Sequence, residues 1–205
     1  MRHFTANYIL PVSGPPIKDG IVSVDGEGEI VGIYDHQSAG LITEPLEQYE
    51  GIIVPGFINC HCHLELSHLL GQVPRGKGLV PFISSVMSQR FIDEDTIMAA
   101  MEKADKVMYE NGIVAVGDIS NKSHSRIIKE NSPVYYHTFI ELLGFDPEKA
   151  ELIFNKAMGL KNEFAPLPAS LAPHAPYSVS QDLFSLLKKS ADANDGISTI
   201  HNQES

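Results

Sequence analysis

The sequence has 205 residues, of which 43% are hydrophobic and 20% charged, and its formal net charge is −11. These values are typical of a globular protein with one or two domains and a sizeable core. The acidic balance and the lack of any basic cluster argue against nucleic acid or an anionic membrane as a partner.

No apolar run is long enough to span a bilayer. The first residues, MRHFTANYILPVSGPP, have neither the apolar core nor the small-residue cleavage site of a signal peptide. The only two cysteines, Cys60 and Cys62, provide no disulfide framework. We therefore expect a cytoplasmic protein without a membrane partner.

The first 53 residues have the pattern of an all-β region. The stretch DGIVSVDGEGEIVGIYD (19–35) contains two β-rich runs, 21–24 and 30–34, on either side of a glycine-rich turn. This pattern predicts a hairpin in a small antiparallel sheet. Val54-Pro55-Gly56 then interrupts the chain, so we place the domain boundary between 1–53 and 54–205.

From residue 54 onward, predicted strands and helices alternate. The strand candidates are 57–61, 113–119, 134–142, 170–174 and 197–201, and the helix candidates are 93–112, 146–164 and 180–196. Acidic residues begin the first helix and Asn-Gly ends it, while Ser180 and Gly196 are suited to cap the last one. Repeated βα units predict an α/β fold with a parallel sheet, open or closed into a barrel.

Each predicted strand ends in polar residues, within NCHCHLE, VGDIS, FIELLG, APHAP and TIHNQES. Active sites of parallel α/β folds lie at the carboxyl ends of the strands. Several polar strand ends together therefore indicate a functional site more strongly than any one of them.

The first strand end contains His61 and His63, which alternation places on one face, with Cys60 and Cys62 on the other. Two imidazoles on one face can bind one metal ion, while the thiols would lie beneath a helix as small apolar groups. By itself, a His-x-His pair is more often a packed or surface pair than a metal site.

Two further residues could complete such a site. His201 ends the last predicted strand and could be a third ligand, and Glu204 could carry the proton that metal-assisted hydrolysis must move. A structural histidine and a solvated loop acid are the alternatives.

Four other strand-end residues are weaker candidates. Prolines flank His174 and would hold its imidazole at the mouth of the sheet, for a substrate-contacting or a structural role. Asp118 could be a hydrogen-bond acceptor or a helix N-cap. Glu141 could reach the pocket or the solvent, and Glu65 follows His63 where the chain leaves the strand.

In sum, these stretches resemble the amidohydrolase superfamily. VPGFINCHCHLELS is similar to its first-strand signature, APHAPYSVS to its fourth-strand segment and STIHNQES to its fifth-strand His-x-x-Glu. The resemblance is to the cytosine deaminase and chlorohydrolase branch, with the deaminases of guanine, S-adenosylhomocysteine and aminofutalosine nearest, and it covers nearly the whole chain. HLELS favours the aminofutalosine type.

The resemblance implies a (β/α)₈ barrel preceded by a small β-sandwich. It implies one divalent metal ion, with zinc favoured and iron as the alternative. His61, His63 and His201 match metal ligands, Glu204 the proton shuttle, and His174 a substrate-contacting position, with Glu65 and Glu141 as further candidate contacts. The implied reaction is hydrolytic deamination of a nucleobase- or nucleoside-like small molecule by a metal-bound hydroxide.

The sequence departs from the family pattern in length. About 250 residues form a (β/α)₈ barrel, whereas the sequence predicts about five of its strands. The family's sixth-strand histidine and eighth-strand aspartate have no counterpart in it. We therefore expect the first half of a barrel, inactive by itself, with exposed strand edges covered by homo-oligomerisation. A non-catalytic metal-binding or assembly module is the alternative.

Overall fold

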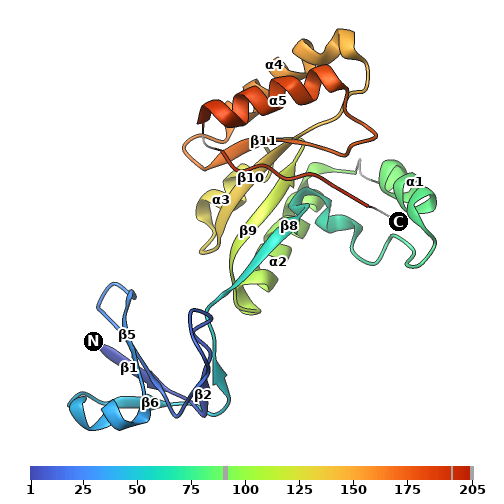
Figure 1. The fold of residues 1–205 in the computed structure, drawn as a ribbon. Helices are drawn as coiled ribbons and strands as arrows, with labels where there is room; N and C mark the ends of the chain where they lie inside the picture. Colours follow the sequence, from blue (N-terminus) through green and yellow to red (C-terminus); the bar gives the residue numbers. More distant parts are fainter. Residues whose placement is uncertain (90–91, 195, 204–205) are drawn as a thin grey trace. The chain divides into compact units, whose positions relative to one another are not determined.

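The computed structural model describes residues 1–89, 92–194 and 196–203 (Figure 1). The chain divides into two compact units, Met1–Gly56 and Phe57–Ser205. Within the described residues, no helix combines the length and the apolar character needed to cross a bilayer.

The first unit consists of short strands in two small sheets. One sheet has the strand order β5-β4-β1-β6 and the other β3-β2-β7. The strands are β1 (Arg2–Thr5), β2 (Tyr8–Ile9), β3 (Ile17–Lys18), β4 (Ile21–Val24), β5 (Ile30–Tyr34), β6 (Leu46–Gln48) and β7 (Ile52–Ile53), and a 3₁₀ helix, η1, spans His36–Leu41.

The predicted hairpin of the first unit is confirmed. Strands β4 and β5 pair in antiparallel orientation. In the turn between them, Asp25 Oδ1 accepts hydrogen bonds from the Glu27 and Glu29 amides, both at 2.9 Å. Gly28 has a φ of +90°, a conformation that glycine adopts without a steric penalty.

The second unit is built on a parallel sheet with the order β11-β10-β9-β8. Its strands are β8 (Phe57–Cys62), β9 (Ile113–Ser120), β10 (Tyr135–Leu142) and β11 (Ala169–Pro173). Helices connect consecutive strands, so four of the predicted strands and the βα alternation are confirmed (Figure 1).

The α-helices of this unit are α1 (Leu79–Gln89), α2 (Glu94–Glu110), α3 (Arg126–Asn131), α4 (Ala150–Glu163) and α5 (Gln181–Asn194), with 3₁₀ helices η2 (Leu64–Leu69) and η3 (Pro147–Lys149). Two helices begin at capping residues that lie where the sequence predicts a helix start. Asp93 Oδ1 accepts the Thr96 amide at 2.8 Å, and Ser180 Oγ accepts the Leu183 amide at 3.2 Å. Helices α1 and α3 are additional to the predicted ones.

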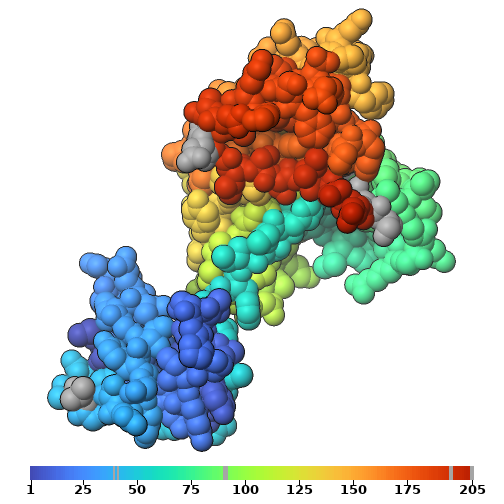
Figure 2. Space-filling model, viewed as in Figure 1, coloured from blue at the N-terminus to red at the C-terminus, as the bar shows by residue number. Residues whose placement is uncertain are grey.

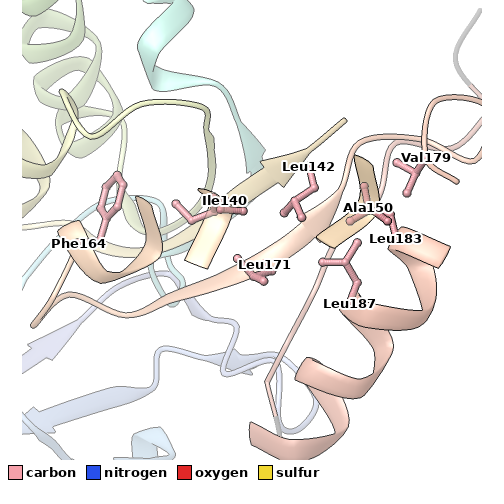
Figure 3. Close-up of a cluster of buried hydrophobic side chains, with 9 residues drawn as sticks. Ile140, Leu142, Ala150, Phe164, Leu171, Val179, Leu183 and Leu187 are labelled. Atoms are coloured by element: carbon pink, nitrogen blue, oxygen red, sulfur yellow. The ribbon is translucent and has the colours of Figure 1, made fainter. Parts of the chain in front are cut away.

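Two apolar clusters attach the helices to the sheet. One joins β9 and β10 to η2, α2 and α3, and includes Leu64, Met101 and Val116. The other joins β10 and β11 to α4 and α5, with Phe164 and Leu183 fully buried (Figure 3). A third, smaller cluster of Ile119, Phe139 and Ala172 lies on the opposite face of the sheet, so the carboxyl ends of the strands are left for the polar residues of the site.

The fifth predicted strand, 197–201, is wrong, because the segment does not enter the ladder. It lies beside β11: Ser198 Oγ donates to Leu171 O at 2.9 Å, and the His201 amide and Nδ1 both donate to His174 O, at 2.8 and 2.9 Å. The Leu171 carbonyl oxygen accepts from this segment, whereas Pro173 has no N–H to donate to a ladder. The segment therefore lies largely exposed on the surface of the unit (Figure 2).

Candidate metal centre

Three histidines meet at the carboxyl end of the parallel sheet. His61 lies near the end of β8, His63 follows that strand directly, and His201 lies on the segment beside β11. Their ligand atoms all lie within 4.8 Å of one another. The ring centroids are 5.1 Å apart for His61 and His63, 4.8 Å for His61 and His201, and 5.2 Å for His63 and His201.

The hydrogen bonds of His201 define its tautomer. Its Nδ1 lies 2.9 Å from the backbone oxygen of His174, and a carbonyl oxygen can only accept, so Nδ1 carries the proton. In the neutral ring, Nε2 is then left with a lone pair, and this nitrogen lies 3.1 Å from His63 Nε2. A hydrogen bond that orients the second ring nitrogen is a regular feature of metal-ligating histidines.

The donor set fits a divalent metal ion. Two nitrogens bound to one zinc ion at tetrahedral geometry lie about 3.3 Å apart, close to the 3.1 Å between the two Nε2 atoms. Three imidazoles with one open position are a common arrangement in catalytic zinc sites. His61, His63 and His201 could therefore hold such an ion.

Glu141 lies on the other side of His201. Its Oε1 is 3.5 Å from His201 Nδ1, and its Oε2 accepts from Asn121 Nδ2 at 3.0 Å. Oε1 is buried and has no hydrogen-bond partner among the described residues. Glu141, His174 and His201 form a second group with metal-ligand geometry, so His201 is common to two candidate triads.

The other predicted site residues differ in their surroundings. His174 Nδ1 lies 2.7 Å from Ser178 Oγ, and its ring centroid is 5.0 Å from that of His201. Glu65 is 9% exposed, and its Oε2 accepts from the Asn121 and Lys122 amides at 3.1 and 3.2 Å. Glu204 lies outside the described residues.

A cavity of about 700 Å³ opens beside the histidines. His61, His63, His174 and His201 line one part of it, and most of the remaining lining is apolar, from η2, the following loop, α1, Leu143 and Tyr177. Neither Glu65 nor Glu141 is part of the lining. Pockets with a few convergent polar groups in an apolar wall are typical of small-molecule sites.

Two features of the site were not predicted. Asn121 joins Glu65 to Glu141 through its backbone amide and its side chain, and a polar residue directly after β9 was the available signal. Lys129 forms a fully buried ion pair with Asp118 at 2.6 Å. A single lysine within RIIKEN gave no sign of this burial.

The two cysteines differ in exposure. Cys62 packs against the cluster around Leu64 and Met101, as predicted, whereas Cys60 is exposed, so the prediction that it lies beneath a helix is wrong. Burial and the neighbouring Asp118 raise the pKa of the Cys62 thiol to about 12. The reactive thiolate is therefore disfavoured at Cys62.

We expect iodoacetamide at pH 8 to alkylate Cys60 well before Cys62. A thiol with the pKa of Cys62 has a thiolate fraction on the order of a thousandfold below that of a free cysteine with a pKa of about 8.5. Peptide mass spectrometry over a time course measures both sites, and the urea-unfolded chain, in which both should react alike, is the control. Equal rates in the folded chain would contradict the burial of Cys62.

Residues 52–205 match the sequence model of the Amidohydrolase family. The chain is 30% identical to an adenosine deaminase of Helicobacter pylori over 178 residues, which cover 83% of this chain and 43% of that protein. It is 25% identical to an aminodeoxyfutalosine deaminase of a Nitratiruptor species over 199 residues, or 92% of this chain and 48% of that protein. The chain thus spans about half the length of these curated relatives.

Solved structures have the same fold. The crystal structure of Helicobacter pylori aminofutalosine deaminase with methylthio-coformycin matches with a TM-score of 0.78 and 23% identity, over 98% of this chain and 50% of that one. An adenosine deaminase from Xanthomonas campestris with bound zinc matches with a TM-score of 0.71 and 17% identity, over 98% and 48%. With the family match over residues 52–205, the chain belongs to the amidohydrolase family.

Proposed function

We propose that these residues form the metal-binding part of a metal-dependent hydrolase that removes an amino group from a nucleobase- or nucleoside-like small molecule. The observation that carries the proposal is the convergence of three imidazoles beside a cavity of about 700 Å³ at the carboxyl end of a parallel sheet. In parallel α/β folds this end is where catalytic sites lie.

His61, His63 and His201 would hold one divalent ion, with zinc favoured over iron. The zinc-bound deaminase of Xanthomonas campestris supports zinc as the first choice. When bound, the ion supplies Lewis-acid activation of a water molecule at neutral pH. His201 is suited to its role because its Nδ1 proton is held by the His174 carbonyl, which leaves Nε2 for the ion.

The remaining predicted residues act on the substrate in this proposal. Glu204 moves the proton from the attacking water to the leaving amine. His174 contacts the substrate in this proposal, and its place in the cavity wall supports that role. Glu65 and Glu141 are further proposed contacts; neither lines the cavity, and Glu141 Oε1 lies 3.5 Å from His201 Nδ1.

The relatives are named as deaminases of adenosine and aminodeoxyfutalosine. Their names support an amine on a nucleoside-like substrate, while the apolar cavity wall supports a substrate with apolar surface. We propose further that the protein is cytoplasmic and that the 205 residues alone release little ammonia. We also propose that a homo-oligomer covers the exposed edge of β8. Phe57 and Ile58 on that strand are 59% and 67% exposed.

The experiment is ligand binding by the zinc-loaded chain. We expect calorimetry to detect methylthio-coformycin binding by the loaded chain and none after the metal is stripped. His36→Ala, which alters an exposed histidine of the first unit, is the matched control and should bind as wild type does. If neither this binding nor ammonia release from adenosine or aminodeoxyfutalosine depends on metal, the non-catalytic module is favoured instead.

A further inference from the structure

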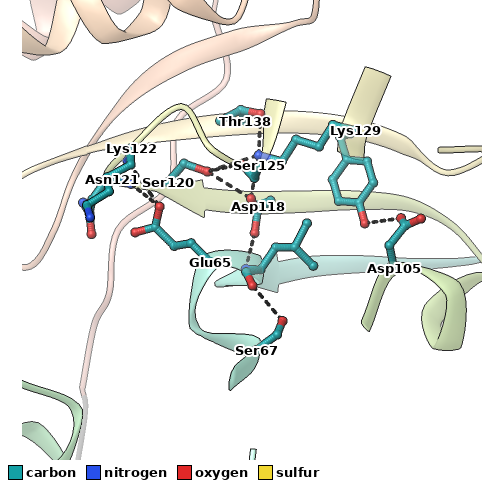
Figure 4. Close-up of polar contacts among 12 residues, drawn as sticks. Glu65, Ser67, Asp105, Asp118, Ser120, Asn121, Lys122, Ser125, Lys129 and Thr138 are labelled. Atoms are coloured by element: carbon teal, nitrogen blue, oxygen red, sulfur yellow. Dashed lines mark hydrogen bonds and ion pairs between the residues drawn. The ribbon is translucent and has the colours of Figure 1, made fainter. Parts of the chain in front are cut away.

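A buried polar network lies behind the histidine cluster, on the helix-covered side of the sheet. Asp118 and Lys129, with side chains 0% exposed, pair at 2.6 Å between Oδ2 and Nζ. Lys129 Nζ also donates to Ser120 Oγ at 3.1 Å and to Thr138 Oγ1 at 2.9 Å, so all three of its donors are used (Figure 4). Nothing in the proposed reaction uses these groups.

The network is attached to the chain directly after His63. Asp118 Oδ1 accepts the backbone amide of Leu64 at 2.7 Å (Figure 4). The other carboxylate oxygen, Oδ2, pairs with Lys129 Nζ and accepts a hydrogen bond from Ser120 Oγ at 3.0 Å. Asp118 thereby connects the rigid end of β9 to the residue that follows a candidate metal ligand.

This attachment matters because β8 is irregular where it carries the histidines. Asn59 pairs with Val116 and Cys62 with Asp118, so the register shifts between these two pairs. His61 lies within this bulge. Gly117 faces it closely: a Cβ at that position would lie 2.8 Å from Cys60 O. Bulges re-aim side chains but interrupt the ladder that fixes them, so the chain needs another attachment beyond the bulge.

We infer that Asp118, held in place by Lys129, is a positioning residue that fixes His63 for metal binding through the Leu64 amide. The inference rests on the proposed metal site of His61, His63 and His201. Groups that orient ligands from behind typically contribute 10- to 100-fold to metal affinity. The expected effect of losing the amide acceptor is therefore a weakening of zinc affinity in about that range.

Two double variants separate positioning from charge burial. Both carry Lys129→Met, which removes the cation. Asp118→Asn keeps a side-chain oxygen for the Leu64 amide, whereas Asp118→Leu is of similar size and offers no acceptor. We expect Asp118→Asn/Lys129→Met to keep zinc affinity within a few-fold of wild type, and Asp118→Leu/Lys129→Met to lose about 10- to 100-fold.

Zinc affinity is measured by competition with a chromophoric chelator, and the visible spectrum of the cobalt-loaded chain reports the ligand geometry. We expect the Asp118→Asn double variant to keep the wild-type cobalt spectrum and the Asp118→Leu double variant to change it. Equal affinity and equal spectra in the two folded variants would overturn the inference alone. A wild-type chain that binds neither ion would overturn the proposed metal site and the inference with it.

Hydrogen exchange of the Leu64 amide tests the inference without relying on the leucine variant to fold. We expect this amide to be protected in the metal-free wild-type chain and in Asp118→Asn/Lys129→Met. Exchange at the rate of an unprotected amide in the wild-type chain would overturn the inference, whatever the variants do.

Discussion

Zinc binding by this chain is expected to be lost when alanine replaces His61 and to survive when alanine replaces His174. The two candidate triads share His201 but use opposite sides of it. His63 Nε2 lies 3.1 Å from Nε2 of that ring, whereas Glu141 Oε1 lies 3.5 Å from its Nδ1. Since Nδ1 donates to the His174 carbonyl, only the Nε2 side has a lone pair for an ion.

The expected size of the effect follows from the ligand count. Loss of one of three imidazoles should weaken zinc binding by more than the roughly 100-fold that loss of an outer-shell partner can cost. The carbonyl that orients His201 belongs to the His174 backbone, and the His174 side chain is not part of the triad of His61, His63 and His201, so His174→Ala should shift the affinity only a few-fold.

Competition titration of zinc with a chromophoric chelator gives both affinities, with His36→Ala as the control for loss of a histidine elsewhere. His201→Ala should abolish tight binding under either triad, because that residue is common to both. The reverse pattern, with zinc kept in His61→Ala and lost in His174→Ala, would move the ion to the Glu141, His174 and His201 group.

Local sequence signals predicted the elements whose ends are made by neighbouring residues. Helix α2 was predicted over 93–112 because acidic residues begin it and Asn-Gly ends it; in the structure Asp93 Oδ1 accepts the Thr96 amide and Gly112 has a φ of +79°. The hairpin of β4 and β5 is similar, since its turn is held by Asp25. These interactions span four residues or fewer, so the sequence contains them whole.

The predictions that were wrong depend on distant partners. Residues 197–201 have a strand-like sequence, but a strand needs a ladder, and Pro173 on the neighbouring β11 has no N–H to offer. Cys60 alternates correctly with its neighbours, yet no periodicity reveals that it is exposed. The burial of Lys129 depends on Asp118 and Thr138 from two different strands, which local composition cannot reveal.

The candidate site was predicted only in part, because some of its contacts are local in the sequence and others join distant segments. The His-x-His spacing is local, and a third histidine at another strand end is expected wherever parallel strands end at one edge. The structure places His61, His63 and His201 together, and their role as metal ligands stays a prediction. The connection through Asn121 to Glu65 and Glu141 needs three chain segments, so spacing could not indicate it.

The largest stability effect is expected for Lys129→Met. This change leaves the Asp118 carboxylate buried without its cation, although the Leu64 amide and Ser120 hydroxyl still donate to it. Removing one partner of a buried ion pair typically destabilises a protein by about 3–5 kcal/mol, because the other charge is left uncompensated. We expect a loss of this size in the free energy of unfolding of the second unit.

The slowest-exchanging amides of β9 and β10 are a suitable measurement, because they report global opening of the second unit without a contribution from the first. Asp118→Leu/Lys129→Met is the informative comparison. It removes both charges and replaces them with apolar groups of similar size, a change that is often neutral or stabilising. We therefore expect this double variant to regain most of the stability that Lys129→Met loses.

The combination separates two roles of the same pair. If the double variant is as unstable as Lys129→Met, the network stabilises the unit through its hydrogen bonds rather than through charge compensation, and the buried-charge explanation is wrong. If it regains stability but binds zinc weakly, the pair stabilises nothing that apolar packing could not supply. Its use would then lie in holding the chain after His63, where β8 has left its regular register.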